Sequence, residues 1–220
     1  MISVATVPIP RFVLFASLIA GSLCTFGERA DARPVKIVVI GDNNIKGKGV
    51  DLTEAYPAQM ERALHARAID AQVINVGRNG DTAISVLARL SSLVPTDTDV
   101  AVVSIGVNDV VYHGVHPDVS RANVREIGQR LRARGIEVVL LPTGGRFQGV
   151  LAAKPEYHIE KGFGPKPGTT EWHLTPAGYA VLVQRDLPLV MNAIARALGP
   201  SPVRVERSAP YRWDPKSELA

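Results

Sequence analysis

Short apolar runs alternate along this chain with segments in which apolar residues recur every three or four positions. Four runs rich in β-branched residues predict strands, over Val35 to Ile40, Gln72 to Val76, Val100 to Ile105 and Glu137 to Leu141. Near-continuous apolarity in runs this short is typical of strands that are covered on both faces. The pattern therefore predicts a parallel sheet.

Helices are predicted between these strands. The first carries Tyr56, Met60 and Leu64 at four-residue steps, as one face of an amphipathic helix requires. The second runs from about Thr82 to Leu93. Three of its residues are expected to face the core: Ile84, Leu87 and Ala88.

Two further helices have recognisable ends. One opens with Pro117 and stops at Gly135. Helices commonly have proline in the first turn and glycine just past the last turn, so these two residues fit the ends of a helix. The other begins at Thr175-Pro176 and ends at Gly199, and Pro188 is expected to kink it. Repeated strands and helices in this order predict a doubly wound α/β domain with its function at the carboxyl ends of the strands.

The periodic pattern stops between Pro142 and Glu171, where glycine, proline and lysine prevail and no fifth strand is recognisable. A loop of this length in a compact domain is more often functional than idle, so it is interpreted as a wall or lid over the site. A length of 220 residues and a hydrophobic content of 46% suit one domain, assigned to residues 33–199. Residues 200–220 are expected to form a flexible tail.

The first residues resemble an export leader. Arg11 precedes the uncharged apolar stretch from Phe12 to Phe26, and Ala30-Asp31-Ala32 has the small-x-small pattern of a cleavage site. The apolar stretch is shorter than the roughly 20 residues of a membrane span. Residues 1–32 are therefore predicted to be a signal peptide that is cut after about Ala32. The mature protein would be periplasmic or secreted without stable membrane insertion, and an uncleaved amphipathic anchor is the alternative.

Composition and charge limit which disulfides and which binding partners can be expected of this protein. Cys24, the only cysteine, lies in the predicted leader, so the mature protein is expected to have no disulfide. The formal net charge is +4, and the arginines between Arg121 and Arg134 alternate with apolar residues at helical spacing. This pattern favours a solvated helix face, and no nucleic-acid partner is predicted without interleaved aromatic residues. Nothing in the sequence bears on the oligomeric state.

Four polar segments follow the predicted strands or precede a helix. Gly41-Asp42-Asn43 comes directly after the first strand. The others are Asn75 to Thr82, Gly106-Val107-Asn108-Asp109 and Trp172 to Pro176. Each segment is common on its own, but the four occur in the order and spacing that an acyl-transfer site on a parallel sheet needs.

Together these segments resemble the motifs of the SGNH (GDSL-type) hydrolases. Bacterial secreted members of that family include acyl thioesterases, lysophospholipases, arylesterases and carbohydrate acetylesterases. The resemblance covers about residues 35–195. It implies a three-layer α/β/α, flavodoxin-like fold with a doubly wound parallel sheet of four to five strands. It also implies a small-molecule acyl ester or thioester as ligand, with no cofactor and no metal.

The resemblance assigns roles to four residues. The oxyanion donors would be the backbone N–H groups of Asn43 and Gly80 and the side chain of Asn108, and His173 would be the base or a polar contact. Gly80 suits this role because a residue without a Cβ lets a carbonyl oxygen approach the main chain. The structural alternative is that Gly80 only makes a turn and Asn108 only caps a loop.

Two departures from the family pattern concern the catalytic triad. Asn43 stands where the family has its serine nucleophile, and an amide cannot be deprotonated near neutral pH or form a normal acyl-enzyme. Thr170 stands at the aspartate position and cannot stabilise an imidazolium with a full charge, although the adjacent Glu171 could substitute by rotation. Neither Ser85, on a helix, nor Ser104, in a strand, is placed to replace the nucleophile.

Two hypotheses follow. The first is an ester hydrolase that is catalytically impaired or inactive in serine-type acyl transfer, with a route by which His173 activates water directly. The second is a pseudoenzyme that binds acyl or carbohydrate esters without turnover, and the chemistry of Asn43 favours it. Nucleotide binding is a third class, suggested by Lys48 among the glycines Gly47 and Gly49, but the spacing does not fit a phosphate loop. The four remaining histidines are interpreted as structural rather than metal-binding: His65, His113, His116 and His158.

Overall fold

The computed structural model describes residues 33–141, 158–163 and 170–199. The predicted signal peptide, the predicted C-terminal tail and most of the predicted lid lie outside the described residues. Among the residues that are described, no helix is long and apolar enough to cross a membrane.

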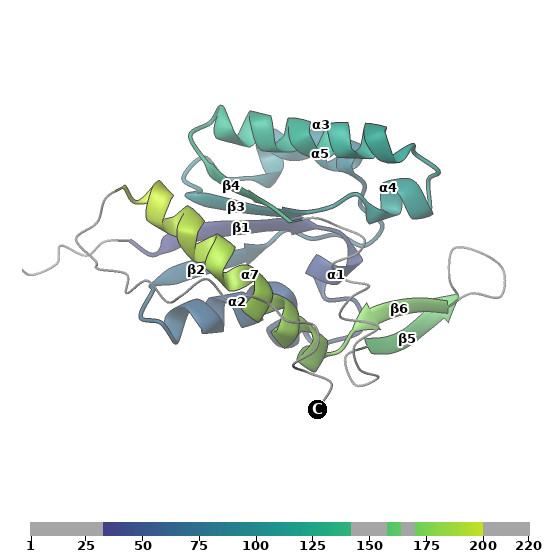
Figure 1. The fold of residues 1–220 in the computed structure, drawn as a ribbon, viewed down its shortest axis with the longest axis horizontal. Helices are drawn as coiled ribbons and strands as arrows, with labels where there is room; N and C mark the ends of the chain where they lie inside the picture. Colours follow the sequence, from purple (N-terminus) through teal and green to yellow (C-terminus); the bar gives the residue numbers. More distant parts are fainter. Residues whose placement is uncertain (1–32, 142–157, 164–169, 200–220) are drawn as a thin grey trace, which may run out of the picture. The chain divides into compact units, whose positions relative to one another are not determined.

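A four-stranded parallel sheet forms the centre of the fold, in the order β2-β1-β3-β4 (Figure 1). Its strands are β1 Val35–Gly41, β2 Ala71–Asn75, β3 Val100–Ser104 and β4 Glu137–Leu140. The register pairs Val39 with Asn75 and Gly41 with Ser104. The four predicted strands and their parallel pairing are therefore confirmed, to within about one residue at each end.

Helices cover both faces of the sheet, as Figure 1 shows. Val35, Ile37 and Val39 of β1 share a core with α2 (Tyr56–His65) and α7 (Pro176–Ala197). The alternate residues of β1 pack with two other helices, α3 (Ala83–Leu93) and α5 (Pro117–Arg132). Because successive side chains of a strand point to opposite faces, one apolar run builds both cores. The predicted three-layer α/β/α fold is confirmed.

The predicted inward face of α3 is wrong. Ile84 is 63% exposed and Ala88 is exposed too, whereas Leu87 is half-buried. The helix instead buries Ala83, Val86 and Leu90. Its start explains the difference, because the Thr82 side chain accepts a hydrogen bond from the backbone N–H of Ser85, and the Ser85 hydroxyl oxygen accepts one from the N–H of Thr82. This reciprocal cap holds the first turn so that residue 83 faces the sheet.

A second, two-stranded sheet lies outside the main one and was not predicted. β5 (His158–Phe163) pairs antiparallel with β6 (Thr170–Leu174), and Ile159 lies opposite His173. The interpretation of Pro142 to Glu171 as a segment without strands is therefore wrong over residues 158–163 and 170–171. The sequence His-Ile-Glu-Lys-Gly-Phe has little β-branched content, so this strand depends on its pairing partner rather than on its own propensity.

Two one-turn helices follow the central strands directly: α1 (Asn43–Lys46) after β1 and α4 (Val107–Val111) after β3. A 3-10 turn, η1 (Leu52–Glu54), then leads into α2. Helices this short carry no readable periodicity, so the hydrophobic pattern could not predict them. They place Asn43 and Asn108 in the first turns of neighbouring helices.

Candidate functional site

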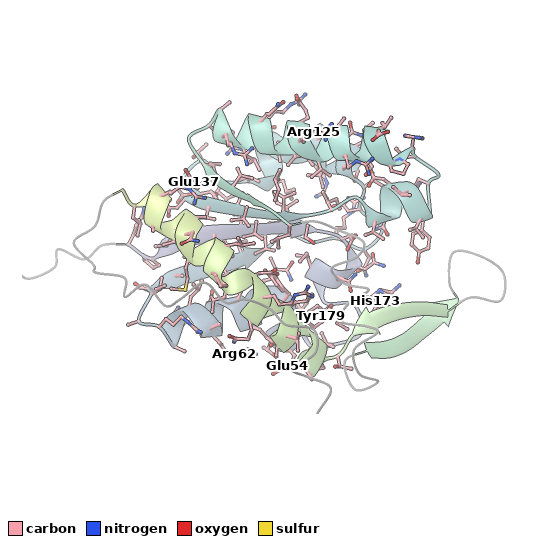
Figure 2. The ribbon with its side chains drawn as sticks, viewed as in Figure 1. Glu54, Arg62, Arg125, Glu137, His173 and Tyr179 are labelled. Carbon is pink, nitrogen blue, oxygen red and sulfur yellow. The ribbon has the colours of Figure 1, made fainter. Side chains whose placement is uncertain are left out.

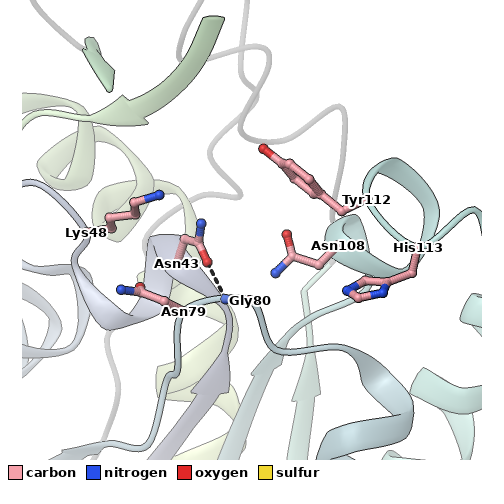
Figure 3. A pocket seen from close by; sticks show the side chains of 7 residues that line it. All are labelled: Asn43, Lys48, Asn79, Gly80, Asn108, Tyr112 and His113. Atoms are coloured by element: carbon pink, nitrogen blue, oxygen red, sulfur yellow. Dashed lines mark hydrogen bonds between the residues drawn. The ribbon is translucent and has the colours of Figure 1, made fainter. Parts of the chain in front are cut away.

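The strand order fixes where a ligand site can form. From β1 the chain crosses to β2 on one side and then to β3 on the other, so the carboxyl ends of β1 and β3 border the point where the order reverses. A pocket of about 430 Å³ opens there (Figure 3). It is lined by Asn43, Lys48, Asn79, Gly80, Asn108, Tyr112 and His113.

Gly41 lets the end of β1 lie directly against β3 and α1. A Cβ at this position would lie 2.3 Å from Cγ1 of Ile45 and 2.6 Å from the carbonyl oxygen of Ser104. Real Cβ atoms do not approach other heavy atoms this closely, so only glycine fits. The close approach allows α1 to begin two residues after the strand and brings Asn43 to the pocket wall.

The carboxamide of Asn43 joins two other parts of the predicted site. Its Oδ1 accepts a hydrogen bond from the backbone N–H of Gly80 at 2.7 Å (Figure 3). Its Nδ2 lies 3.4 Å from Nε2 of His173. Because an amide nitrogen only donates, this contact is a hydrogen bond only when Nε2 of His173 is the acceptor. The structure thus brings Asn43, Gly80 and His173 together.

The backbone conformation of Gly80 is itself a reason for glycine at this position. Its φ of +78° lies in the left-handed region, which disfavours residues with a Cβ. No heavy atom lies within 4 Å of the position that a Cβ would take, so crowding is not the cause. The preceding residues are tied to α1 by Asn75, whose Nδ2 donates to the carbonyl of Ile45 and whose Oδ1 accepts from Gly77.

Asn108 and Asp109 join the third segment to the second. Nδ2 of Asn108, a buried side chain, donates to the carbonyl of Asp81 at 2.9 Å. Both carboxylate oxygens of Asp109 accept from the N–H of Ala83, at 2.9 and 3.1 Å, and this residue is 0% exposed. A carboxylate at the first residue of α3 also interacts favourably with the helix dipole. These bonds fix the position of Asn108 relative to Gly80.

Neither candidate replacement serine is placed as a nucleophile. The Ser85 hydroxyl donates to Oδ1 of Asp81 at 2.7 Å, and the other oxygen of that buried carboxylate pairs with Arg89. Ser104 is buried within β3. Neither residue lines the pocket.

Asp42 is a buried acid directly beside Asn43. Burial raises the pKa of its carboxyl to about 6, although the N–H of Asn44 stabilises the ionised form, and repulsion from Asp81 and Asp109 raises the pKa further. The carboxylate caps α1 by accepting from Asn44 at 3.2 Å. Burial, and secondarily the charge of Asp42, also raise the pKa of the Tyr179 phenol (labelled in Figure 2).

A model of the GDSL-like Lipase/Acylhydrolase family matches residues 39–162, which is more than half of the chain. The chain belongs to this family.

Curated relatives and solved structures agree with this membership. Esterase TesA of Pseudomonas aeruginosa is 29% identical over 127 residues, a match that spans 57% of this chain and 63% of TesA, less than two thirds of that protein's length. An arylesterase of Vibrio mimicus is 26% identical over 62% of this chain and 83% of its own. The crystal structure of AlinE4, an SGNH-hydrolase family esterase, has a TM-score of 0.55 at 24% identity and covers 76% of this chain and 98% of AlinE4. The predicted fold family is thereby confirmed.

The three positions predicted for the triad lie on two elements, Asn43 on α1 and both Thr170 and His173 on β6. His173 lies in β6 and is 2% exposed, and Figure 2 places it at the end of the β5–β6 hairpin nearest α1. Thr170 lies at the start of the same strand. Its side chain and that of Glu171 lie outside the described residues.

The other histidines divide into structural and pocket residues. His113 lines the pocket, a position that the structural interpretation of this residue did not anticipate. His65 Nε2 lies 2.9 Å from the carbonyl of Ala71, and His116 caps α5 by accepting from the N–H of Asp118. The side chain of His158 lies outside the described residues. Within the described ranges, no group of three or more histidine, cysteine or acidic residues could hold a metal ion.

Sequence reasoning missed four of the residues that line the pocket: Lys48, Asn79, Tyr112 and His113. Asn79 lies inside the second polar segment, directly before Gly80, which was predicted as an oxyanion donor. Tyr112 and His113 directly follow α4, three and four residues after Asp109. Lys48 and its two flanking glycines were noticed in the sequence, but only as a possible phosphate loop whose spacing does not fit.

Proposed function

We propose that this family member binds an acyl ester or a related carbonyl compound in its pocket and does not form an acyl-enzyme. The esterase relatives support an ester ligand. The observation that carries the proposal is the carboxamide of Asn43, which bonds to Gly80 N–H and lies within hydrogen-bond distance of His173. A serine at this position would present a nucleophile to the base, whereas the amide presents a donor.

The surroundings of His173 oppose a route in which it activates water. The side chain is 2% exposed, and its Nε2 faces the Asn43 amide. A general base must lie within hydrogen-bond reach of the proton that it removes. Thr170 at the aspartate position would add no charge to stabilise an imidazolium. Binding without turnover therefore fits this site better than hydrolysis.

In the proposed complex, a ligand carbonyl takes the place of Asn43 Oδ1 at the N–H of Gly80. The Asn43 N–H and the Asn108 side chain are the further donors in this proposal. Such donors stabilise a carbonyl oxygen whether or not a covalent bond follows. The leader-like residues 1–32 support a periplasmic or secreted location for this pseudoenzyme.

Hydrolysis of p-nitrophenyl acetate and of longer acyl esters tests the proposal. The purified protein, cleared of host esterases, is compared with Asn43→Ser, Asn43→Ala and His173→Ala. We expect no turnover in the starting protein or in the two alanine variants. Asn43→Ser should gain activity of roughly 10²-fold over background, reduced from that of a complete triad because the aspartate is missing.

Activity in the starting protein that disappears in His173→Ala would refute the binding-only proposal and establish the water route. A stable adduct of the starting protein with a fluorophosphonate probe would refute the placement of Asn43 at the nucleophile position. The double variant Asn43→Ser with His173→Ala is the matched control, and it should lose the gained activity.

A further inference from the structure

Two of the proposed carbonyl donors, at Gly80 and Asn108, are oriented by the main chain of one residue, Asp81. The N–H of Asp81 donates to the carbonyl of Arg78 at 3.1 Å and closes the turn that carries Gly80. The carbonyl of Asp81 accepts a hydrogen bond from Nδ2 of Asn108 at 2.9 Å. A displacement of Asp81 would therefore move both donors together.

The side chain of Asp81 is held from helix α3. The residue is 1% exposed, Oδ1 of its carboxylate accepts from the Ser85 hydroxyl at 2.7 Å, and Oδ2 accepts from the guanidinium of Arg89. Arg78 also approaches Oδ1, but its Nε stays 3.7 Å away and its side chain is 66% exposed. A hydrogen bond between charged groups is stronger than one between neutral groups. Arg89 is thus the cation that ties Asp81 to α3.

Arg89 itself does not line the pocket that the described residues form, and its side chain is 28% exposed. An ion pair that is largely removed from water contributes little net stability, because the desolvation of its charges offsets their attraction. Its directional bonds instead fix the orientation of the groups that it joins. Here those groups lead to Gly80 and Asn108, which do line the pocket. Figure 3 shows the carboxamide nitrogen of Asn108 directed toward Asn43 and Gly80.

We propose that Arg89 is a positioning residue, which acts through Asp81 to aim the Gly80 N–H and the Asn108 side chain at a ligand carbonyl. The inference rests on the proposed function, because it names what aligns the donors of that site. Without Arg89, the nearest cation to the buried carboxylate among the described side chains would be Arg78, at 3.7 Å. A buried charge that loses its partner is strongly unfavourable, so Asp81 would turn toward water and displace both donors.

NMR spectra of the ¹⁵N-labelled protein test this inference without a ligand. Arg89→Met removes the cation and keeps much of the side-chain volume. We expect the signals of the Gly80 N–H and the Asn108 carboxamide to shift. Exchange of the Gly80 N–H with water should become about tenfold faster, the size expected when a hydrogen bond to a charged group is lost. A merely structural role would instead speed the exchange of core amides, such as that of Val102, and leave both donor signals in place.

Two further variants separate the charge of Arg89 from its shape. Arg89→Lys keeps a cation beside Asp81 and should restore most of the starting signals. Arg78→Met is the matched control, because it makes the same change beside the same carboxylate, and it should alter neither the Gly80 exchange rate nor the Asn108 signals. Thermal melting verifies that each variant is folded. If Arg89→Met does not fold, Arg89→Gln retains a neutral donor and should show the same changes at smaller size.

Titration with methyl butyrate, a small acyl ester, measures binding through the Gly80 signal in the same spectra. We expect about tenfold weaker binding in Arg89→Met, since two donors lose their alignment. The affinity should be unchanged in Arg78→Met.

The outcomes separate this inference from the function on which it rests. Unchanged donor signals in a folded variant that lacks the Arg89 cation, or equal changes in Arg78→Met, would overturn the inference. Failure of methyl butyrate and of longer acyl esters to bind the starting protein would overturn the proposed function. The ligand-free spectra would still decide whether Arg89 holds the two donors in place.

Discussion

The candidate site has two halves that are held in different ways. The sheet-borne half consists of Asn43, Gly80 and Asn108, which follow the central strands and are joined by hydrogen bonds and close backbone contacts. The hairpin-borne half is His173 on β6, whose Nε2 lies 3.4 Å from Nδ2 of Asn43. The predicted oxyanion donors therefore follow the strands of the central sheet, whereas the predicted base lies on the separate two-stranded sheet. Substitutions in the first half should cost stability, and those in the second should cost mainly function.

The largest effect is expected from Gly41→Ala. The new Cβ would collide with the backbone carbonyl oxygen of Ser104 and with the Cβ and Cγ1 of the Ile45 side chain, and the Ser104 backbone cannot yield easily. We expect a loss of about 3 kcal/mol in the free energy of unfolding, measured by urea denaturation. Gly114→Ala is the control, because Gly114 has a φ of +62° but open space around it, and it should cost about 1 kcal/mol. Equal losses in the two variants would contradict the close packing of β1 on β3.

Asp42→Asn should stabilise the protein, because the amide keeps the cap on α1 without a buried charge. A pKa raised from 3.8 to about 6 means that ionisation is penalised in the folded state. The contribution of Asp42 to stability is thus complete below pH 3.8 and is lost as the pH rises through about 6. Urea denaturation should show a gain of roughly 2 kcal/mol at about pH 7 and none in acid. A gain that is the same at both pH values would refute this account.

Gly80→Ala tests the sheet-borne half at the pocket itself. A left-handed φ costs an alanine about 1 kcal/mol, with no clash to add to it. Thermal or urea unfolding should show this modest loss. Gly80→Asn is the matched variant and should lose less, since asparagine tolerates this conformation better. A loss as large as that of Gly41→Ala would show that space around Gly80 is limited.

The smallest effect is expected in the hairpin-borne half. His173→Gln keeps an acceptor that could face Nδ2 of Asn43, so the free energy of unfolding should fall by only about 0.5 kcal/mol. The double variant with Asn43→Ser and His173→Gln should nevertheless lack the esterase activity that is expected of Asn43→Ser alone, because a glutamine side chain cannot act as a base. A large loss of stability in urea would show that the hairpin is an integral part of the core and would remove the distinction between the halves.

Sequence patterns predicted the sheet-borne half well and the hairpin poorly. The strands were recognisable because β1 and β3 bury both of their faces, which leaves a continuous apolar run with polar residues directly after it. β5 carries no such run, and its partner follows it across a connecting segment of the chain. Its pairing is a property of two segments together, which a pattern within one segment cannot show.

Pocket-lining residues were predicted from the sequence only where they belong to a motif of the family. Asn43, Gly80 and Asn108 came from the resemblance, but Lys48, Tyr112 and His113 owe their position to the one-turn helices α1 and α4. A single turn leaves no periodic trace in the sequence. The exposure of Ile84 was likewise missed, because the cap at Thr82 sets which face of α3 turns inward.

The hydrogen bond between Asn43 Oδ1 and Gly80 N–H occupies the donor that a ligand carbonyl would use in the proposed complex. A ligand carbonyl would replace the Asn43 carboxamide oxygen as the acceptor for the Gly80 N–H. One acceptor would take the place of a similar one, so this hydrogen bond should contribute almost nothing to the enthalpy of ligand binding. In the proposed complex, discrimination among ligands would therefore depend on the other residues that line the pocket.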